Sequence, residues 1–343
     1  MKRYLIQETS SIKDALVSLN NIAYDTLSLL VVNEAEQMVG SLTDGDIRRG
    51  LISGARLEDP VSTIMHRDFK FIPETEFNVA RLKEFRESRI FFIPILDESS
   101  HIVDVINLRK YKSHLPIDAV LMAGGKGERL RPLTEKTPKP LLPVGDKCII
   151  DHNVDSLISY GVDHINVTVN YLGEQITEHY SKPRSGVQIR TFREPRFLGT
   201  IGSIKFVDSF CNDTLLVMNS DLFTNIDYED FFLHFQSHEA EMSVAAVPYN
   251  VSIPYGILDL DGIEIKGLQE KPKYNYYANA GIYLIKKDVL DQIPDNEFFN
   301  ATDLIDKLIS LNKKVIRYPL NGTWFDIGTP TEYQKALDFV KHL

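Results

Sequence analysis

A glycine-rich turn directly after a short apolar run is the feature that most restricts how this chain can fold. The apolar run covers residues 118–122, and residues 121–143 read LMAGGKGERLRPLTEKTPKPLLP. Glycines let bare backbone N–H groups approach an anion closely, while nearby cations neutralise its charge. The turn therefore predicts a phosphate site at the end of a buried strand.

The spacing within this turn excludes two common phosphate-binding motifs. No Lys-Ser or Lys-Thr pair follows its last glycine, so it does not have the form of a Walker-type loop. Leu130 stands where the third glycine of G-x-G-x-x-G would be. The phosphate site must therefore belong to another class of protein.

Short apolar runs alternate with helical patterns from Asp118 onward. After the first run, the predicted strands cover residues 165–169, 214–218 and 242–247. Nearly unbroken apolar runs suit a parallel sheet that is buried on both faces. In such open α/β sheets, ligands bind beyond the carboxyl ends of the strands. We therefore expect the glycine turn and residues 219–221, which each follow a strand, to face a substrate.

The first third of the chain is an internal repeat. A predicted helix over 12–22 and two predicted strands recur about sixty residues later, which indicates one module made of two similar halves. The expected strands are 27–32 and 37–42 in the first half, and 91–96 and 102–106 in the second, after a helix over 79–85. The polar segment 110–116 is the predicted linker.

Bulk properties exclude several classes of partner. The net charge of −10 over 343 residues argues against a general nucleic-acid binder. No apolar run is long enough to span a membrane, and the opening MKRYLIQETS has no signal-peptide segment, so we expect a cytoplasmic protein. Cys148 and Cys211 have no C-x-x-C spacing, and we expect both to be reduced, buried thiols.

Two aspartates are candidate metal ligands. Asp221 follows a predicted strand, and Asp326 lies in the sequence WFDIGTP at 324–330. Carboxylates at a strand end suit Mg²⁺, a hard cation that prefers oxygen, although a single aspartate is more often a turn or cap residue. Thr329 is the predicted N-cap of a final helix over 330–342.

Taken together, the motifs from residue 117 onward resemble the sugar-phosphate nucleotidyltransferases, which join a nucleoside triphosphate to a sugar 1-phosphate. The turn with Arg129, the LGTIG segment, the EKP and NAGIY segments and WFDIGTP occur in the family's order. The resemblance implies a Rossmann-like α/β catalytic domain with a mostly parallel sheet over 116–343. It also implies Mg²⁺ held by Asp221 and Asp326.

The resemblance assigns roles to three sets of residues. Catalysis would depend on Arg129, Lys139 and Lys271. The nucleotide would contact Ala123, Gly124, Gly125, Gly127, Glu194, Gly199 and Thr200. The sugar phosphate would contact Gly202, Tyr255, Gly256, Glu270, Lys271 and Asn279. Because a sugar 1-phosphate is already an anionic nucleophile, the reaction needs positioned cations rather than a general base.

The N-terminal repeat resembles a tandem pair of cystathionine-β-synthase (CBS) motifs, an α+β regulatory module over 1–115. Such motifs typically bind adenosine nucleotides through G-x-x-T-x-x-D, which Gly40, Thr43 and Asp46 match. The second half has Asp104, Asn107 and Lys110 at these positions. We expect an adenine or guanine nucleotide effector at the first half. The alternative is a structural pair that mediates dimer contacts.

Glu194 bears on the choice of base. Guanine offers N1–H and an amino group on one edge, and a carboxylate can accept from both. The combination with CBS motifs resembles the glucosamine-1-phosphate guanylyltransferases of legionaminic acid pathways. The predicted substrates are therefore GTP and glucosamine 1-phosphate. Alternatives are a mannose- or heptose-1-phosphate guanylyltransferase, a glucose-1-phosphate thymidylyltransferase, and a nucleotide sensor without catalysis.

Overall fold

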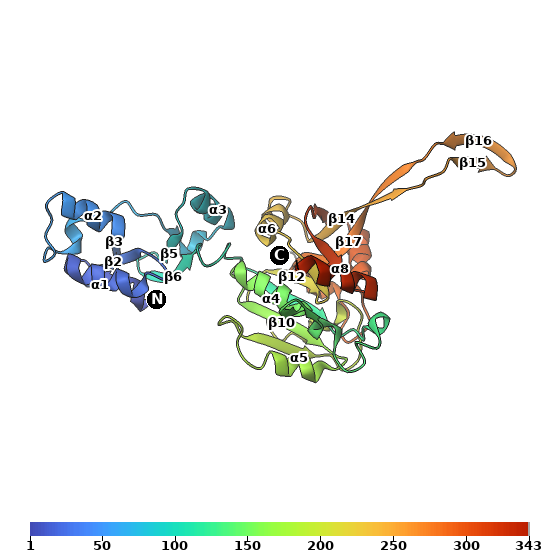
Figure 1. Ribbon diagram of the computed structural model, residues 1–343, viewed down its shortest axis with the longest axis horizontal. Helices are drawn as coiled ribbons and strands as arrows, with labels where there is room; N and C mark the ends of the chain where they lie inside the picture. Colours follow the sequence, from blue (N-terminus) through green and yellow to red (C-terminus); the bar gives the residue numbers. More distant parts are fainter. Residues whose placement is uncertain (342–343) are drawn as a thin grey trace. The chain divides into compact units, whose positions relative to one another are not determined.

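The computed structural model describes residues 1–341 of the chain (Figure 1). It divides into two compact units, Met1–His114 and Leu115–Leu343, called unit 1 and unit 2 below. Residues 108–117, all of them described, hold no helix or strand, and the boundary falls within this stretch. Each unit therefore has its own sheets and its own core.

Unit 1 consists of two halves with the same strand order. The first half contains β1 Leu5–Gln7, α1 Ile12–Ile22, β2 Ser28–Val32, β3 Met38–Thr43 and α2 Asp44–Ile52. The second contains β4 Ile72–Pro73, α3 Val79–Glu87, β5 Phe92–Leu96 and β6 Ile102–Asn107. In both sheets the first pair of strands is parallel and the second pair antiparallel. The predicted repeat is confirmed.

Side-chain caps explain where the helices of the first half begin. Ser11 accepts from the backbone N–H of Asp14, and Thr43 accepts from that of Asp46. In both cases the aspartate reaches back to the N-cap residue, which completes a capping box and satisfies N–H groups that have no partner within the helix.

Unit 2 is built on a seven-stranded sheet in the order β11-β10-β7-β12-β17-β14-β18. The strands are β7 Asp118–Ala123, β10 His164–Val169, β11 Ile189–Arg193, β12 Thr214–Asn219, β14 Met242–Ser252, β17 Lys273–Lys286 and β18 Val315–Pro319. Only β17 is antiparallel to its neighbours in this sheet. The expected mostly parallel α/β fold is confirmed. The central strand β7 is almost entirely buried, as its unbroken apolar run predicted.

The helices of unit 2 follow strands, and all but α8 connect one strand to a later one. They are α4 Ile149–Ser159, α5 Gly173–His179, α6 Tyr228–Ser237, α7 Ala301–Ser310 and α8 Pro330–Val340. The chain passes from β7 to β10 and β11 on one side, then returns to place β12 on the other side of β7. This reversal opens a crevice beyond the carboxyl ends of β7 and β12, where open α/β sheets bind their ligands.

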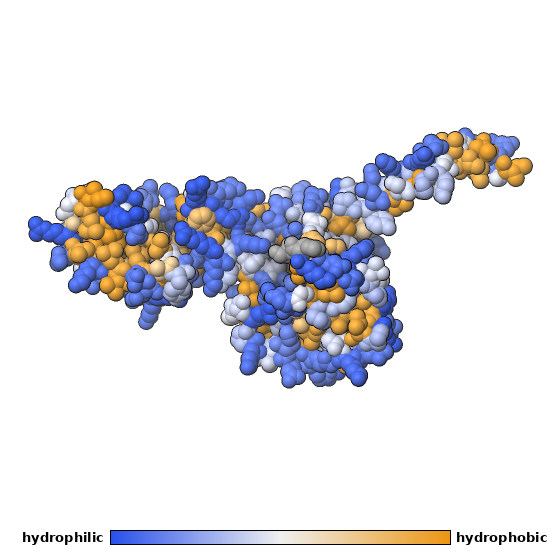
Figure 2. All heavy atoms as spheres, in the orientation of Figure 1, coloured by the Kyte–Doolittle hydropathy of each residue, from blue (hydrophilic) through white to orange (hydrophobic). Residues whose placement is uncertain are grey.

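A long β-ribbon leaves the sheet of unit 2. Pairing between β14 and β17 extends to Ser252 and Lys273, and the hairpin of β15 Ile257–Asp261 and β16 Glu264–Gln269 follows. This β15–β16 hairpin projects from the body of the unit (Figure 1), and apolar atoms lie on its surface (Figure 2). Its exposed apolar side chains are Ile257, Leu258, Leu260, Ile263, Ile265 and Leu268.

The predicted final helix begins where expected. The Thr329 side chain accepts from the backbone N–H of Glu332, and Pro330 occupies the first turn. α8 ends at Val340, and the predicted end at His342 lies outside the described residues. Among the residues described, no helix combines the length and apolar character needed to cross a bilayer.

The two cysteines are free, as predicted, but their predicted burial is wrong. Cys148 is half-buried and Cys211 is exposed. Cys148 precedes α4, and Cys211 lies in the segment before β12. Cys211 therefore lies in a connection outside the helices and strands, and Cys148 ends the two-residue strand β9 Lys147–Cys148.

Candidate active site

A cavity of about 390 Å³ lies at the carboxyl ends of β7 and β12. All seven residues predicted to contact the nucleotide line it, and so do Arg129, Lys139 and Asp221. These residues are far apart in the sequence of unit 2, and folding brings them together around one cavity. The crevice predicted from the strand pattern is therefore where most of the proposed nucleotide site gathers.

The glycine turn has the conformation that its composition predicted. Gly127 is left-handed, with φ of 62°, and precedes a 3₁₀ turn over Glu128–Leu130. The buried Thr134 donates its hydroxyl to the Gly127 carbonyl at 2.8 Å. A β-carbon at residue 127 would lie 3.1 Å from the β-carbon of Lys139. Glycine therefore lets the turn pack closely against the stem of the cationic residue.

Glu194 is a buried carboxyl group in the wall of the cavity. Its Oε2 accepts from the Leu198 backbone N–H at 3.1 Å. Burial raises the pKa of Glu194 to about 7, although the hydrogen bond from Leu198 opposes the shift. A β-carbon at residue 124 would lie 2.1 Å from Glu194 Oε1, so only glycine at that position leaves room for the carboxyl group.

Two carboxylates and two cations form a cluster at one end of the site. Lys139 is 7% exposed, and its Nζ pairs with Asp221 Oδ2. Asp326 lies on β19 Trp324–Asp326, opposite Leu222 on β13 Leu222–Thr224. Burial raises the pKa of Asp326, and the Asp221 charge raises it further, while Lys139 and Arg129 act in the opposite direction. The fold therefore brings the two distant aspartates into electrostatic contact.

Arg129 is positioned against the segment that carries Asp326. A β-carbon at Gly328 would lie 2.9 Å from Arg129 Nη2. The glycine of WFDIGTP thus makes room for the guanidinium group. This contact brings the glycine turn next to the second aspartate.

The two aspartates fit a divalent cation. Asp221 Oδ1 is buried and has no hydrogen-bond partner among the described residues, while Oδ2 is paired with Lys139. A buried carboxylate oxygen without a partner is costly, and a hard cation would satisfy it. Asp221 and Asp326 are therefore the residues here that could hold Mg²⁺.

The predicted sugar-phosphate residues do not gather at the cavity. None of the six lines it. Tyr255, Gly256, Glu270 and Lys271 flank the strands of the exposed β15–β16 hairpin. The Asn279 amide donates to the Tyr283 hydroxyl at 2.9 Å. Gly202 donates its N–H to the Phe299 carbonyl at 3.1 Å, a packing contact beside the site.

Several cavity residues had no individual role assigned from the sequence, although residues 219–221 were expected to face a substrate. Ser220 donates its hydroxyl to the Met122 carbonyl at 2.7 Å, and Ser203 donates to the Thr168 hydroxyl at 2.9 Å. Only the fold places Ser203 at the cavity. Phe197 is 49% exposed and also lines it. Its position between Glu194 and Gly199 was a usable signal, since an exposed aromatic ring in a binding segment can stack on a base.

Unit 1 contains its own cavity of about 540 Å³, lined by residues from both halves. Its wall includes Thr43 but neither Gly40 nor Asp46. Burial raises the pKa of Asp46, but hydrogen bonds from Thr43 and the charge of Arg49 outweigh this and hold it below its usual range. A β-carbon at residue 40 would lie 2.7 Å from Met65 Sδ. Gly40 and Asp46 therefore have packing and capping contacts.

The cationic side chains around the unit 1 cavity favour an anionic ligand. The lining includes Arg48, Lys70, Arg89 and Arg109. Arg48 is paired with Asp44 at 3.0 Å, and Lys70 lies 3.7 Å from Asp68. Arg109 stacks on the ring of Phe91.

Family models match both parts of the chain. The nucleotidyl transferase model matches residues 118–342, and the CBS domain model matches residues 2–53. The first match covers well over half of the sequence. The chain belongs to the nucleotidyl transferase family, and it carries an N-terminal CBS domain.

Curated relatives are similar over this same region. A putative mannose-1-phosphate guanyltransferase of Sulfolobus acidocaldarius is 32% identical over 223 residues, which are 64% of this chain and 62% of the relative. The bifunctional protein GlmU of Methanocaldococcus jannaschii is 31% identical over 229 residues, which are 64% of this chain and 53% of that protein. The chain thus spans less than two thirds of these relatives.

A solved structure shares the fold of unit 2. The crystal structure of HddC from Yersinia pseudotuberculosis has a TM-score of 0.52 and 24% identity, and covers 65% of this chain and 99% of HddC. A second structure of HddC, complexed with GMP-PN, has a TM-score of 0.51 and 23% identity, and covers 65% of this chain and 99% of HddC. At this identity the likeness establishes the fold.

Proposed function

We propose that this protein is a sugar-1-phosphate nucleotidyltransferase that converts GTP and glucosamine 1-phosphate to GDP-glucosamine and pyrophosphate. The observation that carries the proposal is the single cavity at the strand ends. It combines a glycine turn, Arg129, Lys139, Asp221 and the buried Glu194. A phosphate cradle, two cations, a metal carboxylate and a base-reading carboxyl group are the parts that this reaction needs.

The reaction forms one phosphorus–oxygen bond and breaks another. A phosphate oxygen of the sugar 1-phosphate attacks the α-phosphorus of the nucleotide, and the bond from that phosphorus to the β-phosphate oxygen breaks. Pyrophosphate leaves with the electron pair and the added negative charge. Arg129 and Lys139 stabilise this charge from fixed positions, so no protein group has to remove a proton.

Asp221 and Asp326 hold the magnesium ion in this proposal. When bound, Mg²⁺ neutralises phosphate oxygens of the nucleotide. Lys139 orients Asp221 by occupying Oδ2, which leaves the buried Oδ1 for the cation.

Glu194 and Phe197 select the base. Ionised Glu194 accepts hydrogen bonds from N1–H and the amino group of guanine, and Phe197 offers a ring for stacking. Burial raises the pKa of Glu194 to about 7, and guanine would lower it, because the two donors of the base favour the deprotonated carboxylate.

Lys271 holds the acceptor phosphate, with Glu270 and Asn279 on the sugar hydroxyls. Lys271 lies on the exposed hairpin, so this assignment requires the hairpin to approach the cavity when substrate binds. The exposed apolar side chains of the hairpin would leave water in such a movement, which favours closure.

Pyrophosphate release across a matrix of nucleotides and sugar phosphates tests the proposal. We expect the highest kcat/KM for GTP with glucosamine 1-phosphate. Mannose 1-phosphate is the second candidate acceptor, because the Sulfolobus relative is named for it. A preference for dTTP or UTP would overturn the guanine assignment, and no turnover with any pair would favour a sensor.

Unit 1 binds a regulatory adenine or guanine nucleotide in its cavity, according to the same proposal. The cationic lining supports this, with Thr43 as a phosphate or ribose contact. Calorimetric titration of the full chain with AMP, ATP, GMP and GDP, with and without catalytic substrates, is the test. Linkage requires equal reciprocal effects, so an effector affinity unchanged by substrates would remove the regulatory role.

Two further parts of the proposal concern the cellular setting. The protein acts in the cytoplasm, and its product serves a legionaminic acid pathway. It associates as a homodimer, as paired CBS motifs commonly do. Light scattering on the purified chain measures the mass, and a monomer at all concentrations would contradict the dimer.

A further inference from the structure

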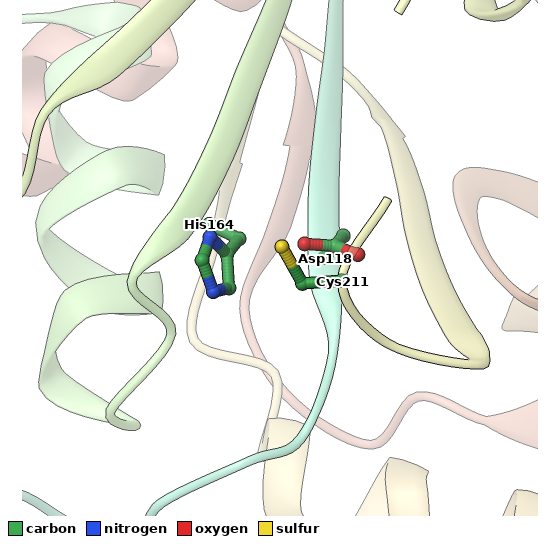
Figure 3. A group of neighbouring side chains, drawn as sticks. All are labelled: Asp118, His164 and Cys211. Atoms are coloured by element: carbon green, nitrogen blue, oxygen red, sulfur yellow. The ribbon is translucent and has the colours of Figure 1, made fainter. Parts of the chain in front are cut away.

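Three side chains that can bind metal meet at the edge of the sheet opposite to the nucleotide cavity. Asp118 begins β7, His164 begins β10, and Cys211 lies shortly before β12 (Figure 3). Asp118 is directly opposite His164 in the parallel ladder, and β12 pairs with β7 on its other side. One possible ligand atom from each residue lies within 4.8 Å of the other two.

One oxygen of the buried carboxylate in this cluster, that of Asp118, lacks a hydrogen-bond partner among the described residues. Asp118 is 0% exposed, and its Oδ2 accepts from the Asn212 backbone N–H at 2.9 Å. Its Oδ1 is buried and has no hydrogen-bond partner among the described residues. An unpaired buried carboxylate oxygen is costly, and a bound cation would supply the missing interaction.

The donor set favours a borderline-soft metal. A thiolate, an imidazole and a carboxylate are the ligand types of Zn²⁺, which binds them at about 2.0–2.3 Å in tetrahedral geometry. Mg²⁺ would not select sulfur. Cys211 is exposed and His164 half-buried, so an ion can enter from solvent. Asp163 Oδ1 lies 3.5 Å from His164 Nε2 and adds negative charge nearby.

A second group with the same three residue types shows what a satisfied cluster looks like. One possible ligand atom each from Cys148, Asp151 and His179 also lies within 4.8 Å of the other two. Asp151 Oδ1 forms hydrogen bonds with His179 Nε2 at 2.9 Å and with the Tyr180 hydroxyl at 3.0 Å. Asp151 Oδ2 lies 3.3 Å from Arg184 Nη1. The carboxylate already has its partners, and the guanidinium group repels a cation.

We propose that Asp118, His164 and Cys211 form a Zn²⁺ site separate from the active site, with solvent in the fourth position. The ion ties together the beginnings of β7 and β10 and the segment before β12. Because the metal binds the folded arrangement, it stabilises unit 2 against unfolding.

Titration of the metal-free full-length chain with Co²⁺ tests the proposal. Cobalt bound to a thiolate gives an intense near-ultraviolet charge-transfer band, which a sulfur-free site at Asp221 and Asp326 cannot produce. We expect this band in the wild type, its loss in Cys211→Ser, and its displacement by Zn²⁺. Cys148→Ser is the matched control and should keep the band. Absence of the band, its persistence in Cys211→Ser, or its loss in Cys148→Ser would each overturn the site.

A thermal measurement provides a second readout. We expect Zn²⁺ to raise the Tm of the wild type and of His179→Gln, but not of His164→Gln. His164 is half-buried at a strand end, and the Tm of its metal-free variant reports whether it folds. An equal rise in wild type and His164→Gln would overturn the role of that ligand. All these readouts are independent of nucleotidyl transfer.

Discussion

The nucleotide half and the sugar half of the proposed active site differ in where their predicted residues lie. Both sets of residues were predicted from the same family resemblance. The nucleotide residues all line one cavity, whereas the six sugar-phosphate residues lie outside it. The nucleotide half is built on buried strand ends such as those of β7 and β12. Much of the sugar half lies on a two-stranded hairpin, which has little intrinsic stability without a covering surface. Residues at the ends of buried strands therefore lie at the predicted cavity, whereas residues on the exposed hairpin do not.

The largest expected effect is on the cation that pairs with Asp221. Lys139→Ala should lower kcat by about 100- to 1,000-fold, because a preorganised charge in the transition state is lost. Steady-state kinetics of pyrophosphate release measures it. The control is Lys136→Ala, an exposed lysine of the same loop, which should have near-normal activity. Equal activity of the two variants would remove Lys139 from the mechanism.

A variant in the β15–β16 hairpin tests directly whether the sugar half of the proposed site joins the nucleotide half. If the hairpin closes over the cavity, Lys271→Ala should raise the KM for the sugar 1-phosphate about 10- to 100-fold, the loss expected for one charged contact, and leave the KM for GTP unchanged. Lys266→Ala on the same hairpin is the matched control, since its partner there is Glu264. If both variants behave like wild type, the hairpin is not part of the site.

The base-reading role of Glu194 predicts a change of donor preference with pH. Glu194→Gln should reduce the kcat/KM ratio of GTP to dTTP by about tenfold, because one charge-assisted acceptor is lost. In the wild type, the KM for GTP should fall as pH rises through about 7, where Glu194 ionises, and the variant should lack this step. An identical pH profile in both proteins would contradict base recognition by this residue.

The smallest expected effect is on stability. Burial raises the pKa of Glu194 to about 7, so the folded state holds its proton more tightly than the unfolded state. The wild type therefore loses stability between about pH 4.5 and 7, where the unfolded chain ionises first. The Tm difference between Glu194→Gln and wild type should become more positive by several degrees from pH 5 to pH 8.

Calorimetry at both pH values measures this difference. Glu135→Gln, at an exposed position in the same unit, is the control and should show no such trend. A difference that stays constant with pH would mean that Glu194 is not the group responsible.

Much of the fold was predictable because it follows from local patterns. The N-cap at Thr329 and the apolar run at β7 each depend on neighbouring residues, and both occur as predicted. The cysteines show the limit of such reasoning. Composition suggested burial, but Cys211 is exposed because it lies in a connection between strands. Likewise, the aspartate of the CBS signature caps α2 and does not line the cavity.

The sequence by itself determined the order of the elements, the repeat in unit 1, the mostly parallel sheet of unit 2 and most of the residues that line the unit 2 cavity. Hydrophobic periodicity, glycine turns and helix caps act over a few residues, so they can be recognised along the chain. The tertiary structure alone decided that Asp221 meets Asp326, that Glu194 is buried beneath Gly124, and that Lys271 lies on a hairpin outside the cavity. Burial, charge coupling and the path of a β-ribbon depend on contacts between distant segments, which only folding creates.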